Sequence, residues 1–332
     1  MAGFSHAAVS SVLNGRAVER RISDRTVQRV EAAARALGYV PNIAARRLRS
    51  HPTGTSQAVL AVITSFESPL LLVSRATTAL QRMIEELGAG PTRFTLSIEM
   101  FHAGHLRELP GILSNDRFSG ALIANTVEQD DLFLAENSIP FPVVLIGRRV
   151  PGYASVVENP ATGQEAARIL IDSGCRRLAV LMPALGTQTS QGRVRQFIAT
   201  AAAAGLPPVV EIGCATRDEH SGYAAMAEHL RGGNPAEGIF TVNDTLAIGA
   251  MHAAREAGLS VPRDLCIVGV GDHDGSPYLA PPLTCAGSSE DLLHAEAARL
   301  LLRNFSGVPG DAVIELPLQT ALRGSTRHLP QS

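Results

Sequence analysis

A short segment near the N-terminus combines strong positive charge with one apolar side chain. Residues 42–49 begin with Asn42, which favours a helix start, and contain Arg46, Arg47, Leu48 and Arg49. So short a helix is not stable alone in water, so a partner must fold it. Arginine binds phosphate, and an apolar side chain can wedge between base pairs of a kinked duplex. The segment therefore predicts a helix that forms in the minor groove of DNA.

Positive charge is concentrated at this end of the chain. The first 50 residues contain nine arginines and three acidic residues, a net charge of +6. The whole chain of 332 residues carries −2 at neutral pH, so the remainder carries about −8. A basic segment on an acidic body is expected when only the basic segment contacts nucleic-acid phosphates.

Composition and motifs argue against several other classes of protein. Hydrophobic residues make up 45% of the chain, and no apolar run approaches the length of a membrane span. No signal peptide is visible, so we expect a cytoplasmic protein. The four cysteines lack the spacing of a metal site, and the sequence has neither a Gly-x-x-x-x-Gly-Lys loop nor a Gly-x-Ser-x-Gly motif. We expect no metal, no cofactor, no membrane contact and no enzymatic activity.

Two short helices are predicted to precede the basic segment. The first covers residues 5–13 and starts at Ser5; the second covers about 24–37 and is capped by Ser23. Apolar residues recur along one face of the second helix, at Val27, Val30, Ala34 and Leu37. These helices would position polar side chains beside the basic segment.

The rest of the chain alternates between two patterns after a linker over 50–56. Apolar runs predict strands over 58–64, 94–99, 120–125, 143–146, 178–182, 238–242 and 265–269. Amphipathic runs predict helices over 70–87, 161–173, 193–204, 222–230, 245–257 and 290–304. This alternation predicts an α/β fold, with parallel sheets covered by helices on both faces and ligands bound beyond the carboxyl ends of the strands.

The N-terminal motifs resemble those of one family. Residues 2–14, 22–26 and 37–42 resemble, in order and spacing, the helix-turn-helix of the lactose-repressor (LacI/GalR) family of bacterial transcription regulators. Segment 42–49 resembles the hinge helix of that family. The resemblance implies that residues 1–49 form a small all-α DNA-binding headpiece. It places the following residues on DNA, with Leu48 as the minor-groove wedge: Ser5, His6, Ala7, Ser10, Ser11, Asn14, Thr26, Asn42, Ala45, Arg46, Leu48 and Arg49.

The headpiece departs from the family pattern in two respects. Ser11 stands where the family usually has Arg, and Ala8 where it usually has Thr. Because Arg can hold guanine through two hydrogen bonds and Ser cannot, base readout should be weaker or different. In addition, the family's first helix would precede the turn at which this sequence begins. Either the native start lies upstream, which we favour, or the headpiece is degenerate.

The body of the chain resembles the family's effector domain, which has two Rossmann-like lobes like those of periplasmic sugar-binding proteins. The matching stretches are 156–159, 193–197, 239–250, 258–265, 281–284 and 322–326. The resemblance implies an effector-binding and dimerisation domain over 57–332. Its N-terminal lobe would comprise about 57–158 and 288–317, and its C-terminal lobe about 159–287 and 318–328. The effector contacts that it implies are Pro69, Arg193, Asn243 and Asp272.

The implied effector site lacks two usual features. Gly271 stands where the family has a ligand-holding acid, and Val270 where it has an aromatic residue. Aromatic residues make up 4% of the chain, and there is no Trp. We therefore expect the cleft to bind something other than a common hexose, or nothing.

Together these patterns predict a homodimeric transcriptional regulator, most simply a repressor, that binds a palindromic operator. A small-molecule effector between the lobes, for example a sugar-like compound, would change their angle and hence the affinity for DNA. Two alternatives remain open at this point. The chain could be a degenerate regulator that senses a ligand as a dimer without competent DNA binding, or a solute-binding protein.

Overall fold

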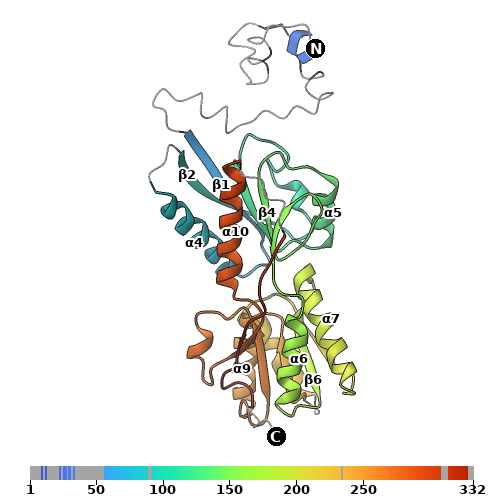
Figure 1. The fold of residues 1–332 in the computed structure, drawn as a ribbon. Helices are drawn as coiled ribbons and strands as arrows, with labels where there is room; N and C mark the ends of the chain where they lie inside the picture. Colours follow the sequence, from blue (N-terminus) through green and yellow to red (C-terminus); the bar gives the residue numbers. More distant parts are fainter. Residues whose placement is uncertain are drawn as a thin grey trace.

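The chain folds into two α/β lobes stacked end to end (Figure 1). The computed structural model describes residues 56–88, 92–232, 235–307 and 313–327. It also describes ten positions between 9 and 33, namely Val9, Val12, Ile22, Ser23, Arg25, Thr26, Val27, Arg29, Val30 and Ala33.

The N-terminal lobe is built on a parallel sheet with the order β11-β5-β4-β3-β1-β2. Its strands are β1 (Ser56–Ser65), β2 (Thr92–Phe101), β3 (Gly120–Ala124), β4 (Val143–Ile146), β5 (Ala154–Val157) and β11 (Val313–Glu315). Its helices are α4 (Leu70–Leu87), α5 (Glu128–Glu136), α10 (Glu290–Phe305) and the 3₁₀ turn η1 (Leu106–Glu108). Every residue of β3, β4 and β5 is buried, as expected for parallel strands covered on both faces.

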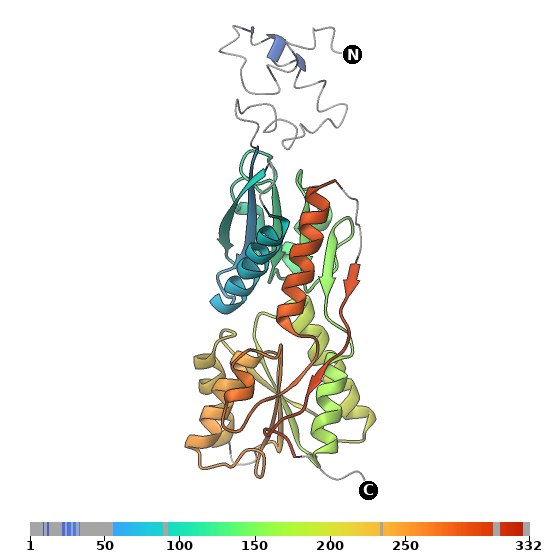
Figure 2. The same ribbon diagram turned by 60° about the vertical axis from the view of Figure 1, so that its left-hand side comes forward.

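Successive residues of β1 supply the two cores of this lobe. Leu60 and Val62 pack in a cluster with residues of α4 and α10, whereas Ala61 and Ile63 pack with α5 and the segment 101–118. Figure 2 shows α10 lying alongside α4 on one side of the sheet. The alternation of side chains along a strand thus places helices on opposite faces.

The C-terminal lobe repeats this plan with the strand order β12-β10-β9-β8-β6-β7. Its strands are β6 (Leu178–Pro183), β7 (Val210–Cys214), β8 (Gly238–Thr241), β9 (Cys266–Val270), β10 (Thr284–Ala286) and β12 (Thr320–Ala321), the last of which runs antiparallel. Its helices are α6 (Thr162–Asp172), α7 (Gln188–Ala203), α8 (Glu219–Arg231), α9 (Asp244–Glu256) and the 3₁₀ turn η2 (Ser276–Tyr278). Helix α6 packs on α7 and α8 packs on α9, on opposite sides of the sheet (Figure 2).

The chain passes between the lobes three times: after β5, after β10 and between β11 and β12. Short segments make these crossings, so the lobes share one boundary along which they can pivot. The geometry confirms the α/β class with two parallel-dominated sheets.

Two glycines allow helices of the C-terminal lobe to touch. A Cβ added at Gly163 of α6 would lie 2.0 Å from the carbonyl oxygen of Arg193 on α7. A Cβ at Gly249 of α9 would lie 2.0 Å from the carbonyl oxygen of Glu219 on α8. Only glycine permits such close backbone approach.

The predicted start of helix 193–204 is wrong by five residues. Helix α7 begins at Gln188, because the Thr187 side chain accepts a hydrogen bond from the Ser190 amide at 3.2 Å and caps the helix there. The first turn of α7 contains only polar residues and glycine, so the sequence shows no apolar residues at helical spacing there.

The described N-terminal positions agree with the second predicted helix. The Ser23 carbonyl accepts hydrogen bonds from the amides of Thr26 (2.8 Å) and Val27 (3.0 Å), which confirms Ser23 as its N-cap. Val12 and Val30 are buried. Within the described parts of the chain, no helix is long and apolar enough to cross a bilayer.

Candidate functional site

The carboxyl ends of strands from both sheets meet where the lobes face each other. Pro69 follows β1, Asn243 follows β8, Gly271 follows β9 and Glu290 follows β10, and all four line one cavity. We call this the interlobe cavity; its described lining is Pro69, Leu71, Leu72, Arg75, Asn243, Asp244, Thr245, Val270, Gly271, His273 and Glu290. This is the edge at which parallel α/β sheets bind ligands.

The interlobe cavity is small in this structure, about 30 Å³. That volume suits a water molecule or two, whereas sites for small organic ligands are usually about 300–1,000 Å³. A metabolite can therefore enter only if the lobes move apart or the lining side chains rearrange.

Arg193 of α7 lies at the boundary between the lobes and is held by a two-point ion pair. Its Nε donates to Oε1 of Glu158 at 2.8 Å, and its Nη2 donates to Oε2 at 2.5 Å. Its Nη1 donates to the carbonyl oxygen of Val242. The two side chains are 10% and 11% exposed, so the pair is largely shielded from water. Burial acts to lower the pKa of Arg193, but the Glu158 carboxylate outweighs it and raises that pKa above its usual value.

Further hydrogen bonds join the lobes around this pair. The Arg149 amide donates to Oε1 of Gln188 at 2.9 Å, and the Thr189 hydroxyl contacts the Gly147 carbonyl oxygen. Arg217 donates from Nη1 to Oδ1 of Asn125 at 3.1 Å. These contacts hold the two lobes together at their boundary.

Asn243 lines the cavity, but both polar groups of its side chain form hydrogen bonds with backbone atoms. Its Oδ1 accepts from the Leu246 amide at 3.1 Å and caps α9, and its Nδ2 donates to the Arg217 carbonyl at 3.1 Å. Pro69, at the start of α4, also lines the cavity. As effector contacts, Pro69, Arg193 and Asn243 stay predictions.

Asp272 is not among the described residues that line the interlobe cavity; its neighbours Gly271 and His273 are. Its Oδ1 lies 2.7 Å from Nη1 of Arg323, which forms an ion pair with it. The structure thus brings together Pro69, Asn243 and, at the adjoining lobe boundary, Arg193, but places Asp272 beside Arg323.

Asp244, the first residue of α9, is a buried acid at the floor of the cavity. One carboxylate oxygen, Oδ2, accepts from the His273 amide at 2.7 Å and from the Ser276 hydroxyl at 3.1 Å, while the Cys285 thiol donates to Oδ1 at 3.4 Å. Burial raises the pKa of Asp244 to about 6, although these hydrogen bonds act to lower it.

Sequence reasoning missed three charged residues of this region: Arg75, Arg217 and Glu290. One signal was available for Arg75, because it shares a helix face with the apolar residues Leu72, Ala76 and Ala79. An arginine on an apolar helix face is expected to be buried together with that face. The Arg75 side chain is indeed buried, with 8% of it exposed.

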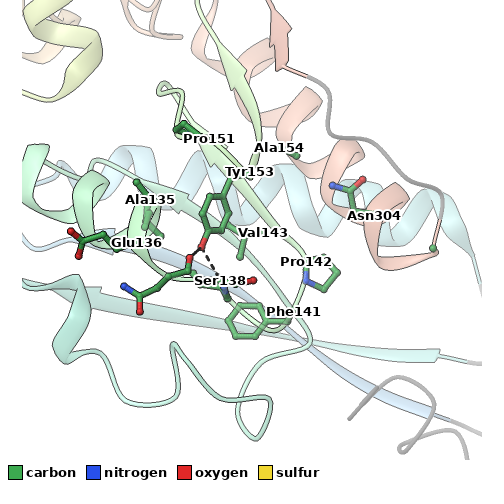
Figure 3. A pocket seen from close by; sticks show the side chains of 15 residues that line it. Ala135, Glu136, Ser138, Phe141, Pro142, Val143, Pro151, Tyr153, Ala154 and Asn304 are labelled. Carbon is green, nitrogen blue, oxygen red and sulfur yellow. Dashed lines mark hydrogen bonds between the residues drawn. The ribbon is translucent and has the colours of Figure 1, made fainter. Parts of the chain in front are cut away.

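A larger groove, of about 670 Å³, lies on the N-terminal lobe between the end of α5, the start of β5 and the end of α10 (Figure 3). The polar group at its centre, the Tyr153 hydroxyl, already has two hydrogen-bond partners within the protein. It donates to the Asn137 carbonyl at 2.5 Å and accepts from the Ile139 amide at 3.3 Å. Among its described lining residues, Glu136 alone carries a charge. The groove therefore offers less specific chemistry than the interlobe cavity.

Most of the predicted DNA-contacting residues lie outside the described residues: Ser5, His6, Ala7, Ser10, Ser11, Asn14, Asn42, Ala45, Arg46, Leu48 and Arg49. Thr26 is described, and its Oγ1 lies 3.0 Å from Oγ of Ser23. The structure described here also contains no group of three or more His, Cys, Asp or Glu side chains placed to hold a metal ion.

Two family models match the chain, one at its N-terminus and one over its C-terminal half. Residues 1–42 match the model of bacterial regulatory proteins of the lacI family, and residues 167–326 match the periplasmic binding protein-like domain. The chain therefore joins a lacI-family helix-turn-helix domain to a periplasmic-binding-protein-like domain.

Known relatives match almost the whole length of this chain. It is 28% identical over 339 residues to the HTH-type transcriptional regulator CelR of Thermobifida fusca, covering 97% of this chain and 94% of that protein. It is 27% identical over 337 residues to the transcriptional repressor PurR of Mannheimia succiniciproducens, covering 99% and 97%. These relatives are transcriptional regulators and not enzymes.

Solved structures share the fold. A LacI-family transcription regulator from Clostridium acetobutylicum superposes with a TM-score of 0.70 at 20% identity, covering 79% of this chain and 98% of that one. The lac repressor dimer bound to operator and the anti-inducer ONPF superposes with a TM-score of 0.68 at 24% identity, covering 98% and 96%.

Proposed function

We propose that the chain is a homodimeric transcriptional repressor that binds a palindromic operator and is controlled by a small-molecule effector held between its lobes. One observation carries the proposal: a lacI-family regulatory domain is joined to two lobes whose strand ends converge on a polar cavity beside the buried Arg193–Glu158 pair. A solute-binding protein would need the lobes but not the basic N-terminal segment.

In this proposal residues 1–49 contact the operator, with segment 42–49 folding in the minor groove and Leu48 opening a base step. The lobes control whether the two hinge segments of a dimer are correctly spaced. Support comes from the three interlobe crossings and from the contacts of Arg193 and Arg149 at the boundary between the lobes.

Effector and operator then act on one conformational equilibrium. A ligand that prefers one lobe angle changes DNA affinity by the ratio of its affinities for the two angles, and DNA changes the ligand affinity by the same factor. Couplings of this kind are typically about 1–3 kcal/mol, or roughly 5- to 150-fold in affinity.

The test is a fluorescence-anisotropy titration of the full chain against fragments of its own promoter region at fixed salt. We expect tighter binding to one fragment than to random DNA, and a change in that affinity with a metabolite from a panel of sugars, nucleosides and small acids. Arg193→Ala should abolish the response to the metabolite, while Arg195→Ala, exposed on the same helix, should preserve it. Equal affinity for all DNA, with and without every metabolite, would contradict the proposal.

A further inference from the structure

The interlobe cavity contains a buried guanidinium that lacks hydrogen-bond acceptors. The side chain of Arg75 on α4 is 8% exposed, and its Nη2 is buried with no hydrogen-bond partner. Its nearest carboxylates are beyond hydrogen-bond range: Oε2 of Glu290 lies 3.9 Å from Nη1, and Oδ1 of Asp291 lies 3.6 Å from Nε. A buried polar group without a partner is costly, so proteins seldom keep one without a use.

An unpartnered acceptor lies beside this donor. Oε2 of Glu290 is also buried without a hydrogen-bond partner, and the Glu290 side chain is 15% exposed. Both Arg75 and Glu290 line the interlobe cavity. A ligand that satisfies both must present an acceptor to Arg75 and a hydrogen-bond donor to Glu290.

A second guanidinium lies near the cavity. Arg217 of the C-terminal lobe is partly buried, and within the described residues it forms no ion pair; its Nη1 donates to Oδ1 of Asn125. Burial and the charge of Arg193 lower the pKa of Arg217 to about 10, still far above neutrality. Arg193 is paired with Glu158, whereas Arg75 and Arg217 both interact with Glu290. Asp291 also lies 3.6 Å from Nε of Arg75, and Asp244 lines the same cavity, so the choice of ligand depends on the unfilled hydrogen bonds of Arg75 and Glu290 and not on net charge.

The acceptor that fits is a carboxylate. A planar carboxylate matches the guanidinium fork through two parallel hydrogen bonds. A phosphate dianion would place two negative charges beside Glu290 and be repelled more strongly. The donor that fits Glu290 is a hydroxyl of the same molecule. No Phe or Tyr occurs among the described lining residues, so the cavity does not offer the aromatic face on which a neutral sugar ring stacks.

We propose that the effector is a sugar acid, whose carboxylate pairs with Arg75 and one of whose hydroxyls donates to Glu290. This inference rests on the proposed function, since it names the ligand class of the same cavity. Because the cavity holds about 30 Å³, binding requires the lobes to separate from the arrangement described here.

The test measures binding by calorimetry on the full chain without DNA. The probes are D-gluconate, D-glucuronate and D-galacturonate, with D-glucose and D-galactose as neutral counterparts and D-glucose 6-phosphate as the phosphate. We expect at least one acid to bind tenfold or more tightly than its neutral counterpart and than the phosphate. Arg75→Met should weaken that binding at least tenfold, whereas Arg82→Met, on the exposed side of the same helix, should leave it unchanged.

Thermal unfolding without ligand checks that the variant is folded. Arg75→Met also removes the cation nearest to Glu290, so its melting temperature should fall, and a single cooperative transition shows that the variant is folded at the temperature of the binding assay. Three results would overturn the inference: no acid binds, a neutral sugar or the phosphate binds as tightly as the acids, or Arg75→Met binds the acid like the wild type. An acid that binds through Arg75 yet leaves promoter affinity unchanged would instead contradict the proposed function and leave this inference standing.

Discussion

Removal of Glu158 should lower the free energy of unfolding, because it breaks the buried Arg193–Glu158 ion pair. The pair is bidentate, with N–O distances of 2.8 and 2.5 Å, and about nine-tenths of each side chain is shielded from water. Glu158→Ala leaves a buried guanidinium with one remaining acceptor, the Val242 carbonyl. Removing one partner of a buried pair costs about 3–5 kcal/mol, and because one acceptor remains we expect this variant to lose about 3 kcal/mol of unfolding free energy.

The reverse change, Arg193→Met, leaves the Glu158 carboxylate without either donor and also frees the Val242 carbonyl, so we expect a cost of about 4–5 kcal/mol. The double variant contains neither charge. Because its desolvation penalty is gone, it should lose only about 1–2 kcal/mol of unfolding free energy, far less than the two single variants together.

The assay is equilibrium urea unfolding of the full chain at pH 7, followed by far-ultraviolet circular dichroism, with Arg195→Met as the surface control. Costs that add within about 0.5 kcal/mol would show that the two residues act independently. The reasoning about the pair would then be refuted.

Three further outcomes follow from the structure. Gly163→Ala should lower the unfolding free energy by about 1–3 kcal/mol and displace Arg193, because its Cβ would meet the α7 backbone at 2.0 Å; Gly192→Ala, which meets no atom closer than 4.0 Å, should be neutral or stabilising in the same urea assay. Burial lowers the pKa of His294, so the unfolded state takes up more protons below about pH 6.5 and stability falls as the pH drops through that window. His294→Leu should therefore lose less stability than the wild type between pH 7 and 5, and an equal loss in both proteins would count against this assignment. Leu48→Ala should weaken binding to the operator more than binding to random DNA, because the wedge acts only at a correctly kinked site; equal weakening in an anisotropy titration would contradict the wedge role.

Long elements with a clear period were predictable from the sequence. The predicted helix 70–87 and strand 143–146 coincide with α4 and β4, because an apolar stripe at helical spacing and a short β-branched run each indicate one structure. Five strands in the described part of the chain were not predicted: β5, β7, β10, β11 and β12. The last three contain two or three residues each, so their pairing depends on distant partners, as when Cys285 pairs with Ala321.

The site was only partly predictable for a related reason. The resemblance to a family indicated Arg193, but its partner Glu158 was only one residue of the matching stretch 156–159 and was not predicted to pair with it. Contacts between residues that are distant in the sequence were not predicted. Asp272 pairs with Arg323, and Arg75 lies near Glu290, more than 200 residues further along the chain. Such pairs are set by how helices and loops pack, which no local pattern records.

A reversible cross-link between the lobes tests most directly whether their movement controls DNA binding. Gly147 follows β4 of the N-terminal lobe, and a Cβ built there lies 3.9 Å from Cβ of Thr189 on α7. That separation suits a disulfide, and the strain of a cysteine at Gly147, where φ is 76°, is common to both redox forms. Gly147→Cys combined with Thr189→Cys should therefore lock the boundary when oxidised. The reduced form of the same variant is the matched control. The account predicts that oxidation changes the Kd for the promoter fragment at least about fivefold; equal Kd values for the locked and unlocked forms would contradict it.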